Sequence, residues 1–205
     1  MTRRADHSAE EIRAMIIEAA EAIMTRNGSG GLTARGIAGA IGYAAGTIYN
    51  HFANLDEVVL AVNMRTIDAL ATAIEKPRRQ AGEAALHRLA DAYIDFTEAH
   101  PHLWAALFED RPGMAPVTDL PWYRTKLERP IALVQAVLAR LDASADSEGL
   151  RAEVLTLWGG LHGICTLAQE GYVGILTMPP TRIMAHLLVD NAIAGLKARR
   201  RKRAK

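Results

Sequence analysis

The sequence is poor in the features that mark several large classes of protein. Its single cysteine, Cys165, cannot form a disulfide within the chain and lies in an apolar run, which favours a cytoplasmic protein with a buried thiol. No window reaches the roughly 18–20 uninterrupted apolar residues that a membrane-spanning helix needs. The N-terminus leads into a charged amphipathic segment and has no apolar signal-peptide core. These absences argue against an exported or membrane-spanning protein, and we expect no membrane partner.

Patterns typical of enzymes and metalloproteins are also scarce. The seven histidines are scattered, and the closest pair, His100 and His102, flanks Pro101, which is typical of a solvated helix junction. No Cys/His cluster has zinc spacing, and no glycine-rich loop follows a strand. The sequence therefore indicates no cofactor and no metal site, and we do not expect an enzyme.

Positive charge is unevenly distributed. The net charge is +1, but residues 197–205 carry seven of the 24 basic side chains and leave the rest with 17 basic against 23 acidic residues. An anionic partner must therefore be met by a local patch or by this end of the chain. We interpret residues 199–205 as a basic tail that attracts DNA non-specifically, touches anionic lipid or stays solvated.

Helical spacing of apolar residues recurs along the whole chain, while strand patterns are weak. Half of the residues are hydrophobic, which is enough for a folded core. Ser8 and Glu11 form a predicted capping box, and Gly28 and Gly42 are predicted to end helices. The predicted helices cover about 8–27, 33–42, 44–50, 54–75, 82–99, 101–109, 121–142, 147–176 and 180–200. The sequence thus predicts an all-α fold.

The stretch TARGIAGAIGYAAGTIYNHF, residues 33–52, holds two short helical fragments with little bulk between them. Inward-facing positions are predicted on both fragments: Ile37, Ala38, Ile41, Ile48 and Phe52. Gly42 permits the turn between the fragments, because it tolerates backbone angles that other residues resist. This is the pattern of a helix-turn-helix, whose second helix enters the major groove of DNA. An ordinary corner between two core helices is the alternative interpretation.

The wider stretch LTARGIAGAIGYAAGTIYNHFANLDEVVLAV resembles the tetracycline-repressor-like (TetR) family of transcriptional regulators. The match extends over about residues 8–65 and includes Leu32-Thr33, Ile37-Ala38, Gly42, Gly46-Thr47-Ile48-Tyr49, Phe52 and Asp56-Glu57. A second stretch, LWGGLHGICTLAQEGYVG, is similar to the Trp-His-Gly (WHG) pattern of one C-terminal subclass, here Trp158, His162 and Gly163. The resemblance implies a homodimer that binds a palindromic double-stranded DNA operator. It also implies an unknown small-molecule effector that shifts the spacing of the two DNA-binding heads.

These expectations divide the chain into three parts. Residues 1–54 form a three-helix helix-turn-helix DNA-binding domain, residues 55–200 a helical ligand-binding and dimerisation domain, and residues 199–205 the tail. Because the last helix of the family ends away from the DNA, the resemblance favours a solvated or non-specific role for the tail.

The predicted DNA contacts come from three places: the start of the first helical fragment, the recognition segment (residues 43–51) and the N-terminal arm. They are Arg3, Arg4, Thr33, Arg35, Tyr43, Ala44, Ala45, Gly46, Thr47, Tyr49, Asn50 and His51. Residues 43–51 contain no Lys or Arg, so arginine pairing with guanine is excluded there, and base contacts must come from methyl packing or an amide. The family usually has a lysine where this chain has Leu55, which removes a phosphate contact. Arg3 and Arg4 reach phosphate or a minor groove, or belong to a solvated terminus.

The predicted effector pocket draws on the large aromatic side chains of the C-terminal part. It comprises Trp104, Phe108, Trp122, Trp158 and His162, although each of them taken alone could be plain core. The dimer interface is predicted on the last two helices, 147–176 and 180–200, whose apolar faces carry Leu155, Leu161, Ile183, Leu187, Leu188 and Ile193. Gly159, Gly160 and Gly163 would allow close helix approach.

The sequence therefore predicts a ligand-responsive DNA-binding transcriptional regulator. Family habit favours a repressor. The alternative is a helical enzyme or a membrane-surface protein, the latter suggested by the basic tail alone. In either case the N-terminal domain would have the shape of a helix-turn-helix but would not bind DNA specifically. Neither alternative explains the pattern of residues 33–52.

Overall fold

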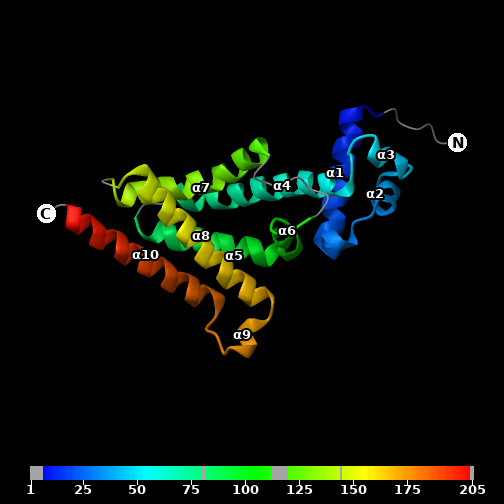
Figure 1. Cartoon of the computed structure of the whole chain (residues 1–205). Helices are drawn as coiled ribbons and strands as arrows, with labels where there is room; N and C mark the ends of the chain where they lie inside the picture. The colour runs from blue at the N-terminus through cyan, green and yellow to red at the C-terminus, as the bar shows by residue number, and fades with distance from the viewer. Residues whose placement is uncertain (1–6, 80–81, 112–119, 144, 204–205) are drawn as a thin grey trace. The chain divides into compact units, whose positions relative to one another are not determined.

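The computed structural model describes residues 7–79, 82–111, 120–143 and 145–203, and every regular element in these ranges is helical (Figure 1). The predicted all-α fold is therefore confirmed. The elements are α1 (Ala9–Asn27), η1 (Ser29–Gly31), α2 (Ala34–Ile41), α3 (Gly46–Tyr49), α4 (Leu55–Glu75), η2 (Pro77–Arg79), α5 (Ala84–Ala99), α6 (Pro101–Ala106), α7 (Pro121–Leu141), α8 (Ser147–Gln169), α9 (Tyr172–Ile175) and α10 (Thr181–Arg203).

The chain forms two compact units, each made from two stretches of sequence. The first unit contains residues 1–66 and 100–124, and the second contains residues 67–99 and 125–205. Helix α6 thus belongs to the same unit as the head. The division at residue 54 that the sequence predicts is a functional one and stays a prediction.

The local signals that begin and end the first helices are confirmed. The Ser8 side chain accepts a hydrogen bond from the Glu11 backbone at 3.2 Å, and Glu11 Oε2 accepts one from the Ser8 backbone at 2.7 Å. Hydrogen bonds to the Glu11 carboxylate from the Ser8 backbone and from the Ser8 side chain lower the pKa of this carboxyl. The Gly42 backbone is left-handed, with φ 75° and ψ 27°, and its N–H donates to the Ala38 carbonyl at the end of α2. A side chain would strain this turn.

The core of the first unit collects the inward faces of α1, α2, α3 and α4. Ile37, Ala38, Ile48 and Phe52 are buried, as predicted, and Ile41 packs against them. The remaining buried members are Ile16, Ala20, Met24, Leu32, Val58, Val59, Val62, Leu103 and Ala106. The helix-turn-helix is therefore packed on both α1 and α4.

In the second unit, α10 packs on α5 and α8. A Cβ placed on Gly160 would lie 2.7 Å from Cδ2 of Leu188, so the small residue allows α8 and α10 to approach there, as predicted. Gly159 and Gly163 have no neighbour within 4 Å of such a Cβ in the part of the chain that the structure describes.

Three details of the second unit correct the sequence analysis. The predicted helix 147–176 is broken, because Gly171 adopts a left-handed φ of 80° between α8 and α9. Helix α10 continues to Arg203, so most of the predicted tail is helical. Ile193 is buried within its own unit at 6% exposure and is not on an exposed apolar face.

None of the described helices combines the length and apolar character that crossing a membrane requires.

Candidate nucleic-acid interface and effector-binding residues

The predicted DNA-contacting surface begins at the N-terminus of α2. The Thr33 hydroxyl accepts a hydrogen bond from the Gly36 backbone at 3.0 Å, which fixes the first turn of the helix. The hydroxyl proton remains able to donate, and Arg35 is exposed in the same first turn. These two predicted DNA contacts therefore lie at one helix end. The predicted contacts Arg3 and Arg4 lie outside the described residues.

The recognition segment presents small and uncharged groups. Ala44, Gly46 and Asn50 are exposed, and the Tyr49 side chain is 54% exposed. The remaining predicted contacts, Tyr43, Ala45, Thr47 and His51, are half-buried. Helix α3 is short and begins with three-residue turns, in which Thr47 N–H donates to Ala44 O at 2.9 Å and Ile48 N–H to Ala45 O at 3.2 Å. Its outer face can read bases only through methyl, phenol, hydroxyl or amide groups.

Two contacts on this surface were missed by sequence reasoning. Nδ1 of His7 lies 2.8 Å from the Tyr43 hydroxyl oxygen, so the residue that precedes the Ser8 cap of α1 helps to place a predicted DNA contact. The Arg13 guanidinium lies 4.2 Å from the centre of the Phe52 ring. This cation–π contact holds a positive charge beside the end of the recognition segment. No local pattern links either pair, because both contacts arise from tertiary packing.

Leu55, where the family usually has a lysine, begins α4 and packs against the core of the first unit. The Asn54 side chain accepts a hydrogen bond from the Glu57 backbone at 2.9 Å, and Glu57 Oε2 accepts one from the Ala53 backbone at 2.8 Å. The first turn of α4 is therefore fixed by packing and capping, without a cation at this position.

The predicted effector residues divide between the two units. In the first unit, Trp104 is buried and meets Phe108 edge-on with ring centres 5.5 Å apart. Phe108 and Trp122 are about half exposed, and Trp122 lies beside the buried Tyr123. Burial raises the pKa of the Tyr123 hydroxyl, and a hydrogen bond with Asn63 opposes the shift. These side chains form two aromatic pairs, one at the end of α6 and one at the start of α7.

In the second unit, Trp158 and His162 lie one turn apart on α8, with ring centres 5.5 Å apart. Trp158 is 42% exposed, whereas His162 Nδ1 lies 3.4 Å from the hydroxyl of the buried Tyr93. Burial lowers the pKa of the His162 imidazole and raises that of the neighbouring Cys165 thiol. His162 therefore has a partner within its own unit, and its predicted ligand contact stays a proposal.

We expect acid to destabilise the second unit through His162. Since burial lowers the His162 pKa below its ordinary value of 6.5, the unfolded chain binds the proton more readily than the folded one. The free energy of unfolding therefore falls as the pH drops through this value. Urea unfolding measures this effect. Between about pH 7.5 and pH 5.5, the free energy of unfolding should fall less in His162→Gln than in the unaltered chain. An equal or larger change in the variant would contradict the assignment, because the other groups are common to both proteins.

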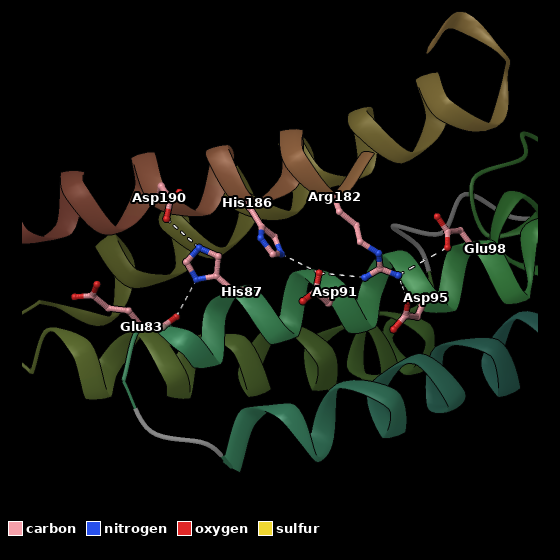
Figure 2. Close-up of polar contacts among 8 residues, drawn as sticks. All are labelled: Glu83, His87, Asp91, Asp95, Glu98, Arg182, His186 and Asp190. Atoms are coloured by element: carbon pink, nitrogen blue, oxygen red, sulfur yellow. Dashed lines mark hydrogen bonds and ion pairs between the residues drawn. The ribbon is translucent and has the colours of Figure 1, made fainter. Parts of the chain in front are cut away.

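A polar network joins α5 to α10 (Figure 2). His87 Nε2 lies 2.9 Å from Asp190, and His186 Nε2 lies 2.9 Å from Asp91. Arg182 donates to Asp91 at 3.1 Å and also to Asp95. Each histidine is thus matched with a carboxylate of the facing helix. Among the described residues, no group of three or more His, Cys, Asp or Glu side chains is placed to hold a metal ion.

Most of the large exposed apolar side chains of the second unit lie on α8, α9 and α10 or directly after α9, and Leu127 lies on α7. Ile183 and Leu187 are 58% and 59% exposed on α10, on the helix that the polar network fixes to α5. Leu161 and Leu188 are half-buried. The structure adds Trp158, Tyr172, Ile175 and Leu176 to the predicted exposed set. The predicted dimer surface therefore retains Leu155, Ile183 and Leu187 as its exposed members.

Known protein families match both the N-terminal and the C-terminal part of the chain. Residues 16–62 match the family of bacterial regulatory proteins described as the tetR family, and residues 86–191 match the tetracyclin repressor-like C-terminal domain. An uncharacterized HTH-type transcriptional regulator of Mycobacterium tuberculosis is 29% identical over 160 residues, which cover 78% of this chain and 71% of that protein.

Solved structures of low identity share the fold. A tetR-family transcriptional regulator from Streptomyces coelicolor aligns with a TM-score of 0.70 at 22% identity, covering 95% of this chain and 83% of that one. SmeT, the repressor of the Stenotrophomonas maltophilia multidrug efflux pump SmeDEF, aligns with a TM-score of 0.59 at 18% identity, covering 89% of each chain. Because the C-terminal family match alone extends over more than half of the sequence, this chain belongs to the TetR family of bacterial transcriptional regulators.

Proposed function

We propose that this TetR-family regulator is a repressor that releases a palindromic operator when a small molecule binds. The outer face of the recognition segment carries the proposal. Ile48 and Phe52 anchor the segment in the core, while Ala44, Gly46 and Asn50 stay exposed around Tyr49. Small residues let the backbone approach base edges, and exposed hydroxyl and amide groups can reach phosphates and adenine.

The proposed effector is an apolar molecule that contacts Trp104, Phe108 or Trp122 in the first unit, or Trp158 and His162 in the second. The effector would shift the population towards a conformation whose two recognition helices no longer fit successive major grooves. SmeT is a repressor of a multidrug efflux pump, and a Bacillus halodurans relative of the same fold is a fatty acid degradation regulator. Since these roles differ, the effector must be found by experiment.

The proposal also includes a homodimer that forms through α8 and α10. Their exposed side chains Leu155, Ile183 and Leu187 support it, because a four-helix contact would bury them. A regulator of this kind works on chromosomal DNA without turning over a substrate, so a cytoplasmic, non-enzymatic protein is proposed.

Selection of bound duplexes from a random library, followed by a salt titration on the enriched sequence, tests the proposal. We expect an enriched palindrome whose affinity falls with salt, since phosphate contacts release counterions. Weak binding without sequence preference that disappears on removal of residues 199–205 would contradict it.

Two variants of the recognition segment refine the same experiment. Tyr49→Phe removes a hydroxyl and should weaken binding to all sequences by about threefold to tenfold. Asn50→Ala should instead relax the preference at one base pair per half-site, by about 1–3 kcal/mol. Tyr172→Phe removes an exposed hydroxyl outside the head and serves as the matched control. Equal selectivity of Asn50→Ala and the unaltered chain would exclude Asn50 from base reading.

A further inference from the structure

Two side chains that follow α6 reach the two flanks of the helix-turn-helix. The Ser29 hydroxyl, in η1, donates a hydrogen bond to the Glu109 carboxylate. Arg111 Nη1 donates to Asp56 Oδ1 at 2.5 Å, and its Nη2 lies 3.4 Å from Glu109 Oε2. A continuous chain of polar contacts thus runs from η1 to the first turn of α4. We call these four residues the flank clamp.

The anchors of the flank clamp bracket the DNA-binding motif. Ser29 precedes the Thr33 cap of α2, and Asp56 follows Phe52, the last residue of the motif. Two further contacts hold α6 to the head: His102 Nδ1 lies 3.0 Å from the Thr25 carbonyl, and the Asn63 amide donates to the Ala106 carbonyl at 3.0 Å. Residues 100–111 therefore touch α1, η1 and α4 of their own unit.

Three of the four residues of the flank clamp are largely shielded from water, whereas the Glu109 side chain is 38% exposed. Ser29 is 7% exposed, and the Arg111 and Asp56 side chains are 17% and 22% exposed. Arg111 Nε is buried and has no hydrogen-bond partner among the described residues. A shielded ion pair is weakened little by salt, and removing one partner leaves the other charge poorly compensated. Arg111 is also too enclosed to serve as an ordinary phosphate contact.

We propose that Glu109 and Arg111 are positioning residues for operator binding, which rests on the proposed function above. They hold η1 and the first turn of α4 so that α2 and α3 meet DNA in one arrangement. The recognition segment has no cation, and Leu55 stands where the family has a phosphate-binding lysine, so few direct contacts support affinity. Operator binding then depends strongly on a helix-turn-helix that is ordered before it meets DNA. If the motif became ordered only on DNA, the entropy lost would lower the affinity.

Operator titrations over a range of salt concentrations test this role. Arg111→Gln and Asp56→Asn should each weaken operator binding by about tenfold or more and leave the salt slope unchanged. The double variant should bind the operator no more weakly than the weaker-binding single variant, because both changes break the same contact between Arg111 and Asp56. Arg111→Lys keeps the charge and should retain part of the affinity, and Ser29→Ala tests the other flank independently.

The matched control is Arg65→Gln. Arg65 pairs with Glu21 at 2.8 Å in the same unit but is half exposed, so its loss should change operator affinity less than about twofold. A salt slope lower by about one in Arg111→Gln would identify a direct phosphate contact and overturn the positioning role. Unchanged operator affinity in Arg111→Gln and Ser29→Ala would also overturn it. If the unaltered chain selects no operator, the proposed function fails, and the flank clamp fails with it.

Discussion

Replacing Ile48 by alanine is expected to abolish specific DNA binding although the side chain never faces the DNA. Ile48 is fully buried in the core that joins α1, α2, α3 and α4. Its truncation leaves a cavity and should lower the free energy of unfolding by about 2–5 kcal/mol. Since α3 is a single short turn, it has little stability apart from this packing. Urea unfolding and operator titration measure the two effects.

Thr47→Ala is the matched control for this experiment, because it alters the neighbouring residue of the same helix without opening the core. Its free energy of unfolding should stay within about 0.5–1 kcal/mol of the unaltered chain, while loss of the hydroxyl weakens DNA binding modestly. If Ile48→Ala unfolds at the same urea concentration and binds the operator equally well, α3 is not anchored as described.

Replacing Leu187 by glutamate is expected to separate the dimer. Leu187 is 59% exposed on α10, so a charge there costs little in an isolated chain. In the proposed interface the same carboxylate would be buried without a partner, and the dimer dissociation constant should rise by about 100-fold or more. Sedimentation equilibrium measures this directly, and affinity for a palindrome should fall in parallel while binding to a half-site persists.

Leu127→Glu provides the corresponding change on α7, where the leucine is 36% exposed, and should leave the dimer intact. Gly163→Ala adds a second test, since a Cβ there meets nothing within 4 Å in the described chain. If α8 has no close partner at this position, Gly163→Ala should stabilise the helix by roughly 1 kcal/mol. In a close helix pair it should weaken the dimer. Unchanged association of both Leu187→Glu and Gly163→Ala would exclude this face as the interface.

The head was predictable from sequence because its signals are local. The Ser8 capping box, the helix start at Thr33 and the Gly42 turn each depend on residues within one helical turn, and the structure has all of them. The burial of Ile37 and Ile48 followed from helical spacing alone. Short-range backbone chemistry and periodicity were therefore sufficient for the helix-turn-helix.

Other features depend on information that spacing does not carry. The break at Gly171 was missed because apolar residues continue through α9 and extend the helical pattern beyond it. Ile193 was assigned to the outer face because periodicity identifies an apolar stripe but not which neighbour covers it. The contacts of His7 with Tyr43 and of Arg111 with Asp56 join residues 36 and 55 positions apart. Such pairs become visible only when the fold brings their helices together.

The separation of roles within the recognition segment has an evolutionary consequence. Ile48 faces the core, whereas Ala44, Gly46 and Asn50 are exposed together with Tyr49, so the outer residues can change without repacking the head. Because each mismatched base pair typically costs about 1–3 kcal/mol, one or two substitutions on this face are enough to redirect a duplicated copy to a new operator. Gene duplication followed by such changes would produce paralogues with separate targets and an unchanged scaffold.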